Sequence, residues 1–171
     1  TFSNSYNRVG QYTEEMKAAG LEIVDSIEAM SDMDAFLLES VDGAQHLEQF
    51  KILAGFGKPV FIDKPLACNY ADAKAIGELA AAKNIPVMTA SAIRYANGIN
   101  SLKDDDETVG CCDAFGPMAL LSDYRDYFWY GIHSAEVLYR FMGKGCTRVR
   151  AISNEKFDVV IGDWADGKVG I

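Results

Sequence analysis

The first part of the chain alternates short apolar stretches with amphipathic stretches of helical period. Four consecutive apolar residues stand in "DAFLLES" at 34–40, and "KPVFID" at 58–63 and "IPVMTAS" at 85–91 repeat this pattern. Continuous apolar runs of this length are typical of strands that are covered on both faces of a parallel sheet. Because strands and helices alternate with short links, the pattern predicts an α/β fold with a doubly wound parallel sheet.

Glycines and capping residues mark the ends of the expected helices. They predict a helix from about residue 11 to Gly20, which takes the position after the helix end. A short strand at 22–26 and a short helix at 26–30 are expected before the first apolar strand. Asp42 and Asn69 can accept hydrogen bonds from the first turns of the two following helices.

The pattern changes after about residue 108. Strand-like stretches stand at 108–121, 147–153 and 157–164, and "GIHSAEVLYRFMG" at 131–143 is an amphipathic helix. The pair Asp166-Gly167 in the last stretch indicates a hairpin turn. We therefore expect a second, α+β domain with an antiparallel sheet.

The two patterns predict two domains, the first at 1–95 and the second at 96–171. The last strand-like stretch runs to the end of the chain. An exposed, unpaired last strand is a liability for a complete protein. We therefore expect the chain to be a fragment whose second domain is truncated.

Composition and charge exclude several classes of partner. The 171 residues include 16 basic and 25 acidic residues, which gives a net charge of -9. Such a surface repels phosphate backbones and acidic membranes, so nucleic acid is not an expected partner. No apolar run approaches the roughly 18 residues of a membrane span. The four cysteines show no metal-binding spacing and are expected to be the reduced thiols of a cytoplasmic protein without a metal site.

Polar residues follow each of the three apolar strands, where open α/β sheets bind their ligands. They are Glu39, Ser40, Asp42 and His46 after the first strand, Asp63, Lys64 and Pro65 after the second, and Ser91 and Arg94 after the third. The proline fixes the backbone after Lys64, so the ammonium group can be directed. A lysine in such a cleft can donate to a substrate oxygen or transfer a proton. The alternative is a surface lysine beside Asp63.

Four separated motifs carry a family resemblance. "DAFLLESVDGAQHLEQF", "GKPVFIDKPLA", "SAIRYA" and "YGIHSAEVLYRFMG" follow one another as in the Gfo/Idh/MocA oxidoreductases, and the chain resembles this family over nearly its whole length. The resemblance implies a Rossmann domain that binds NAD or NADP, and a second domain that forms the substrate pocket and the contact between subunits. It implies hydride transfer at a hydroxyl-bearing carbon of a sugar, a cyclitol or a related small molecule, by a homo-oligomer of two or four subunits.

The same resemblance implies roles for individual residues. Lys64 and His133 match the catalytic residues, Lys64 in contact with substrate and nicotinamide and His133 polarising the reacting hydroxyl. The expected cofactor-binding residues are Ser40, Asp42, His46, Asp63, Lys64, Pro65 and Arg94. Asp63 stands where the family usually has glutamate. Trp129 and Tyr130 precede the histidine motif and are expected to bind substrate together with Lys64 and His133.

Two departures from the family pattern stand out. The chain has no G-x-G-x-x-G motif, because Thr1 falls past the first strand, the glycine loop and the second strand of the family's domain. We therefore expect this chain alone to bind NAD(P) weakly or not at all. Trp129 replaces the acid that stands four residues before the histidine. Asp123, Asp126 or Tyr130 could substitute for that carboxylate.

Other interpretations of these residues remain open from the sequence. His46 fits an ordinary residue of a helix start, and His133 with Glu136, three residues on, fits a structural ion pair. The aromatic run at 123–132 fits a core segment, a subunit contact or a wall for a sugar ring. The rival functions are a non-catalytic relative that acts as a binding or assembly module, which the missing acid favours, and an NAD-using glycosidase.

Overall fold

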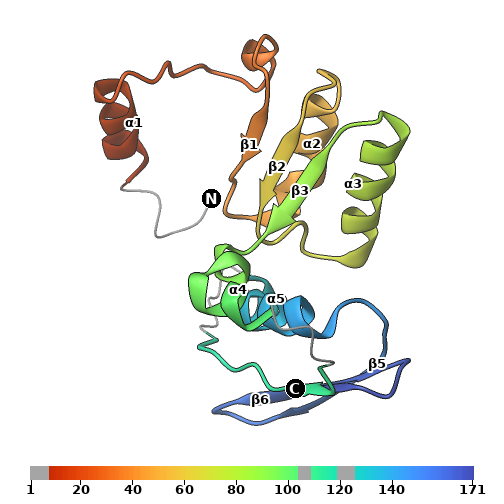
Figure 1. Cartoon of the computed structure of the whole chain (residues 1–171). Helices are drawn as coiled ribbons and strands as arrows, with labels where there is room; N and C mark the ends of the chain where they lie inside the picture. Colours follow the sequence, from red (N-terminus) through yellow and green to blue (C-terminus); the bar gives the residue numbers. More distant parts are fainter. Residues whose placement is uncertain (1–7, 104–108, 119–125) are drawn as a thin grey trace. The chain divides into compact units, whose positions relative to one another are not determined.

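The structure is a computed structural model that describes residues 8–103, 109–118 and 126–171. These residues form two compact units, and each is described by itself (Figure 1). The first unit includes the chain up to Ala90 and the short helix η5 (Asp126–Phe128). The second begins at Ser91 and includes the rest of the described residues.

A parallel three-stranded sheet is the centre of the first unit. Its strands β1 (Phe36–Leu38), β2 (Val60–Asp63) and β3 (Val87–Ala90) lie in the order β1-β2-β3. Both pairs are parallel, as the three apolar runs predict. All three strands therefore point their carboxyl ends at the same edge of the sheet.

Five helical segments precede or connect these strands. They are α1 (Val9–Ala18), η2 (Glu28–Met30), η3 (Gly43–Gln45), α2 (His46–Leu53) and α3 (Tyr70–Ala82). The predicted caps are confirmed, because Asp42 accepts from the Ala44 N–H at 3.0 Å and Asn69 from the Asp72 N–H at 2.8 Å. The strand expected at 22–26 is wrong. That stretch has no neighbouring strand in the sheet to pair with its backbone, and a single extended segment cannot satisfy its own hydrogen bonds.

The core of the first unit lies between the sheet and helices α2 and α3, which cover one of its faces (Figure 1). Phe36, Val60 and Ile62 point into it from the strands, and Phe50 and Ile76 from the helices. Each of these five side chains is at most 5% exposed. Along β1 the burial alternates, so Leu37 on the other face is 72% exposed.

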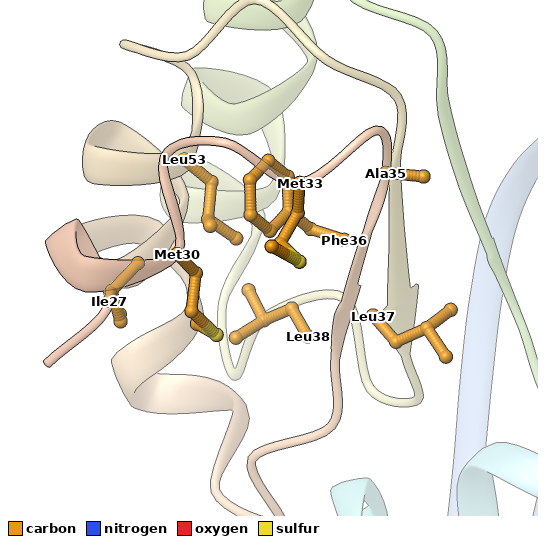
Figure 2. Close-up of a pocket in the computed structure, with 8 residues that line it drawn as sticks. All are labelled: Ile27, Met30, Met33, Ala35, Phe36, Leu37, Leu38 and Leu53. Atoms are coloured by element: carbon orange, nitrogen blue, oxygen red, sulfur yellow. The ribbon is translucent and has the colours of Figure 1, made fainter. Parts of the chain in front are cut away.

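An apolar pocket of about 290 Å³ lies beside β1 (Figure 2). It is lined by Ile27, Met30, Met33, Ala35, Phe36, Leu37, Leu38 and Leu53. A sugar or a nicotinamide needs a few convergent polar groups to orient it. Because all eight lining side chains are apolar, this pocket does not fit such a ligand, and the chemistry has to be sought at the carboxyl edge of the sheet.

The second unit combines three helical segments with a four-stranded sheet. The helical segments are η4 (Ala92–Tyr95), α4 (Asn97–Lys103) and α5 (Gly131–Met142), and the strands are β4 (Cys111–Cys112), β5 (Cys146–Ser153), β6 (Asp158–Trp164) and β7 (Val169–Gly170). The sheet order is β4-β7-β6-β5. The expectation of an antiparallel sheet needs correction, because β4 pairs with β7 in parallel while the other two pairs are antiparallel.

Two elements of the second unit differ further from the sequence prediction. Helix α4 was not predicted, because its "NGINSLK" combines glycine, asparagine and serine with few apolar positions. The strand expected over 108–121 is confirmed only at Cys111–Cys112 within the described residues. The expected hairpin at Asp166-Gly167 is confirmed by the antiparallel pairing of β6 with β7, with Gly167 at a φ of 88°.

Helix α5 packs against one face of this sheet through Trp164. The indole Nε1–H donates to the Gly143 carbonyl at 3.0 Å, and the Trp164 side chain is 5% exposed. A Cβ at Gly162 would lie 2.7 Å from the indole ring, so this strand position requires glycine. The helix ends as predicted at Gly143, which has a φ of 69°.

No helix among the described residues is both long and apolar enough to cross a membrane. No group of three or more His, Cys, Asp or Glu side chains among them is arranged to hold a metal ion.

Candidate functional site

The predicted site residues fall in both units. The first set lies at the carboxyl edge of the parallel sheet. Asp63 ends β2, and Lys64 and Pro65 follow it directly. The Lys64–Pro65 peptide bond is cis. Asp63 and Lys64 are half-buried, and Pro65 is fully buried. The lysine therefore stands where open α/β sheets bind ligands, with its backbone anchored in the interior.

The turn after β2 packs closely against the turn after β1. A Cβ at Gly43 would lie 2.7 Å from the Pro65 ring and 3.0 Å from the Pro65 carbonyl oxygen. Only a residue without a side chain allows this approach, which explains the glycine between Asp42 and the start of α2. The position of the Lys64–Pro65 turn thus depends on the segment that follows β1.

His46 joins the same two turns from the interior. Its ring is 0% exposed, with Nε2 at 2.7 Å from the Ser40 carbonyl oxygen and Nδ1 at 3.3 Å from the Leu66 carbonyl oxygen. The shorter contact is a hydrogen bond donated by Nε2–H. Since both nitrogens face backbone carbonyls and the ring is fully buried, we interpret His46 as a residue that positions the two turns, and not as a direct ligand of a cofactor.

Ser40 and Asp42 stand between β1 and α2. The Ser40 hydroxyl donates to the Gln49 side-chain oxygen at 2.8 Å, and Asp42 uses one carboxylate oxygen for its cap. Both side chains are half-buried. A carboxylate has about four lone-pair positions, so Asp42 retains acceptor capacity for a ligand hydroxyl.

The second set of site residues lies in the second unit, where His133 is on the first turn of α5. Its Nδ1 is 2.6 Å from the Oγ of Ser91, which is 0% exposed. Ser91 is also the N-cap of η4, and its Oγ accepts from the Ile93 N–H at 3.3 Å. Ser91 was noted in the sequence only as a polar residue after a strand. Its contact with His133 joins positions 42 residues apart, and no local signal announces it.

Arg94 and Glu136 form an ion pair in the second unit. Arg94 Nη1 lies 3.1 Å from Glu136 Oε2 and 3.4 Å from the Glu136 carbonyl oxygen. The two side chains are 30% and 20% exposed. The pair joins η4 to α5. Glu136 is therefore bonded to Arg94, and the sequence alternative in which it pairs with His133 is not what the structure shows.

Aromatic rings precede His133 as the sequence predicts. Tyr130 packs edge-on against the His133 ring with 5.5 Å between centroids, and Trp129 packs in the same way against Tyr130 at 5.5 Å. Asp123 and the Asp126 side chain, two of the candidates for the missing acid, lie outside the described residues. For the third, Tyr130, the described contact with His133 is this ring packing.

The sequence of the chain matches a family of oxidoreductases with an NAD-binding Rossmann fold over residues 3–91, which is more than half of its length. The chain therefore belongs to the Gfo/Idh/MocA oxidoreductase family, as its motifs predict. The nicotinamide cofactor of the prediction, NAD or NADP, agrees with this family's fold. No curated protein matches the sequence significantly.

Solved structures show the same fold. A protein named as a dehydrogenase from Thermotoga maritima has a TM-score of 0.77 at 21% identity, over 95% of this chain and 58% of its own. A protein named as a myo-inositol dehydrogenase from Sinorhizobium meliloti has a TM-score of 0.73 at 19% identity, and the match covers 95% of this chain and 57% of that protein. The WlbA dehydrogenase from Bordetella pertussis, solved with NADH and UDP-GlcNAcA, has a TM-score of 0.67 at 16% identity. This match covers 92% of this chain and 54% of the WlbA chain. The chain spans little more than half the length of these proteins.

The described residues fit one part of a nicotinamide dinucleotide. The carboxyl edge of the parallel sheet offers the half-buried polar groups of Ser40, Asp42 and Lys64, which suit the hydroxyls of a ribose and the groups near a reacting carbon. A pyrophosphate requires a glycine-rich loop at a helix N-terminus, and the sequence has no G-x-G-x-x-G. The polar groups at this edge therefore suit the hydroxyl-bearing nicotinamide-ribose half, and the sequence contains no glycine-rich motif of this type for the phosphates.

Proposed function

We propose that the chain is part of an oxidoreductase that transfers hydride between NAD or NADP and a hydroxyl-bearing carbon of a sugar, cyclitol or related molecule. The observation that carries the proposal is Lys64, which directly follows β2 at the carboxyl edge of the sheet in a chain of this family. Of the similar solved structures, one is named as a myo-inositol dehydrogenase and another contains UDP-GlcNAcA, and both support a carbohydrate-like substrate. The cofactor, when bound, supplies the hydride chemistry.

The protein's own residues would bind and orient the reactants and transfer the proton. Lys64, Ser40 and Asp42 would contact the nicotinamide-ribose half and the reacting carbon, and Pro65 and His46 would hold the turn that carries Lys64. His133 would contact the substrate oxygen, and Trp129 and Tyr130 would form an aromatic wall beside it. Arg94, bonded to Glu136, would hold η4 against α5.

Turnover with a panel of polyols, cyclitols and nucleotide sugars tests the proposal. An alcohol that loses hydride to the cofactor and a proton to the protein yields a ketone, and the reduced cofactor absorbs in the near ultraviolet. We expect at least one panel member to give this absorbance with NAD or NADP when the whole oxidoreductase, of which this chain is proposed to be part, is used. Release of a sugar without net cofactor reduction would identify the NAD-using glycosidase instead. Binding of a sugar with neither reaction would identify the non-catalytic relative.

We also propose that the exposed face of the second sheet forms a contact between identical subunits. On the face turned away from α5, Ile152 on β5 lies opposite Val159 on β6, and Ile161 on β6 lies opposite Arg150 on β5. Ile152 is 62% exposed. Beside them Arg148 and Arg150 both pair with Asp163, and the hydrogen bond from Arg148 holds the pKa of that carboxyl below its ordinary value. An apolar strip with ordered charges at its margin is typical of protein interfaces.

Ile152→Asp should disrupt this association. A charge in the centre of an apolar interface loses its hydration without gaining a partner, so we expect at least a ten-fold weaker association by light scattering. Val149→Asp is the matched control, because Val149 has the same 62% exposure but lies on the opposite face of β5, in register with Gly162. A wild-type protein that is monomeric at micromolar concentration, or equal effects of the two substitutions, would contradict the proposed interface.

A further inference from the structure

The hydroxyl of Ser91 has one proton to donate and no access to water. Its side chain is 0% exposed. Its oxygen already accepts from the Ile93 N–H at 3.3 Å, so that contact does not use the hydroxyl proton. Among the hydrogen bonds of the described residues, the remaining partner of this hydroxyl is Nδ1 of His133 at 2.6 Å. The large majority of buried polar side-chain groups in proteins have a hydrogen-bond partner, so we infer that the hydroxyl proton of Ser91 points at Nδ1.

This geometry determines which nitrogen of His133 carries the ring proton. A nitrogen that accepts a hydrogen bond is unprotonated, and a neutral imidazole then has its proton on the other nitrogen. The distance of 2.6 Å is at the short end for a hydroxyl donor, which indicates a well-formed bond. We propose that Ser91 is a positioning residue that orients the His133 ring and fixes it as the tautomer with the proton on Nε2.

The proposal assigns Ser91 the orienting task that a carboxylate performs in other histidine sites. A carboxylate beside Nδ1 accepts a hydrogen bond from Nδ1–H, which keeps the ring proton on Nδ1 and so leaves Nε2 as a base. A serine hydroxyl that donates to Nδ1 has the opposite effect, because it leaves Nδ1 unprotonated and the ring proton on Nε2. Trp129 occupies the position where the family pattern has an acid, and Ser91 comes from η4, in a different part of the sequence. The pair also has the short distance of an activated serine nucleophile, but a fully buried hydroxyl cannot reach a substrate.

The tautomer defines what His133 can do, and this consequence rests on the proposed oxidoreductase function. An Nε2–H donates a hydrogen bond to a substrate oxygen and polarises it, but it cannot accept a proton through the same nitrogen. The alcohol would lose its hydride to the oxidised cofactor and its hydroxyl proton to a different base. Lys64, the other catalytic residue that the family resemblance implies, is the candidate for that base. His133 would stabilise negative charge on the oxygen.

Nitrogen-15 NMR of the histidine rings tests the tautomer directly. The chain has only two histidines, and His133→Gln identifies the signals of His133 by their loss. At alkaline pH, where an imidazole is neutral, we expect Nδ1 of His133 to resonate as an unprotonated nitrogen and Nε2 as a protonated one. A protonated Nδ1 in the wild-type protein would overturn the proposal, and this measurement needs no Ser91 variant that has to fold.

Ser91→Ala tests whether the serine is responsible. Without its donor, the ring should exchange between its two tautomers, so the Nδ1 signal should move upfield and the Nε2 signal downfield, toward each other. Ser101→Ala is the matched control, since it removes a hydroxyl that donates to the Gly98 carbonyl at 3.1 Å on the exposed helix α4. We expect its His133 signals to equal those of the wild type. An Nδ1 signal in Ser91→Ala that also equals the wild type would refute the role of Ser91.

Kinetics separate this inference from the proposed function. In a preparation that oxidises a substrate, Ser91→Ala should lower kcat about 2- to 10-fold, the range that corresponds to one hydrogen bond of ordinary net strength, with the KM for the cofactor unchanged. If no substrate is oxidised, the proposed function fails while the NMR result still decides the tautomer. If turnover occurs and the tautomer is the other one, only the role of Ser91 fails.

Discussion

Lys64→Ala and His133→Ala each lower kcat by about 10²- to 10⁴-fold in a preparation that shows the proposed turnover, because a positioned acid or base and a positioned hydrogen-bond donor to a developing oxyanion each contribute an effect of this order. The lysine follows β2 at the carboxyl edge of the sheet, and the histidine stands on the first turn of α5. In the proposed function, loss of either side chain would remove a group that contacts the reacting atoms. Steady-state kinetics with saturating cofactor measure the effect.

The controls for this prediction differ between the two residues. Lys74→Ala removes an exposed lysine whose partner is Glu78 at 3.5 Å, so it should leave kcat unchanged. His133→Ala leaves the buried Ser91 hydroxyl without its partner, which we expect to cost about 1 to 3 kcal/mol of folding free energy. Thermal melts therefore have to accompany the kinetics. Wild-type kcat in both alanine variants would exclude the catalytic assignment of Lys64 and His133.

Trp129 gives a finer test of the same chemistry. If the carboxylate that the family has at this position limits proton transfer through His133, Trp129→Asp should raise kcat or shift its pH optimum. If the indole instead packs against a sugar ring, the same change should raise KM. The packing of Trp129 against Tyr130, and of Tyr130 against His133, favours the second outcome.

His46→Ala destabilises the protein by about 2 to 4 kcal/mol. The ring is fully buried between the Ser40 and Leu66 carbonyls, so its removal leaves the Ser40 carbonyl oxygen without its donor and opens a cavity. An unpaired buried polar group costs about 1 to 3 kcal/mol, and an unfilled cavity adds to this cost. Urea unfolding followed by far-ultraviolet circular dichroism is the measurement. Both tryptophans, Trp129 and Trp164, belong to the second unit, so their fluorescence would report on that unit instead.

Glu48→Ala is the matched control for His46 on the same helix. Its carboxylate pairs with Lys51 on the exposed side of α2, and such pairs contribute at most about 1 kcal/mol. An equal unfolding midpoint for His46→Ala and the wild type would show that His46 does not hold the two turns. His46→Ala has a second use, because a displaced Lys64–Pro65 turn should also lower kcat.

The sequence was sufficient for the elements whose signals are local. The three apolar runs predict the parallel strands, because a strand buried on both faces needs a continuous apolar segment and little else. Asp42 and Asn69 predict their caps, since capping depends on two or three consecutive residues. The strand predicted at 22–26 was wrong because that prediction, too, used only local signals. The composition of that segment suits a strand, but a strand also requires a neighbour, and the sequence does not reveal the absence of one.

The features of the candidate site likewise fall into those that the sequence indicates and those that only the structure shows. Lys64 could be singled out from the sequence, because its position after a strand and before a proline is a local feature, and the family motifs single out His133. The contact of His46 with the Leu66 carbonyl and the close approach of Gly43 to Pro65 join residues about 20 positions apart. Periodicity describes one element at a time, so it cannot report which turns pack together.

The sequence by itself determined that this protein is an α/β chain of an oxidoreductase family, with a lysine at a strand end and a histidine on an amphipathic helix. These features depend on the order of residue types along the chain. The tertiary structure alone decided that Glu136 pairs with Arg94, that β4 joins the second sheet in parallel, and that Ser91 is the partner of His133. Each of these joins residues more than 40 positions apart, and such contacts exist only after the chain has packed, because burial then selects the partner that satisfies each polar group.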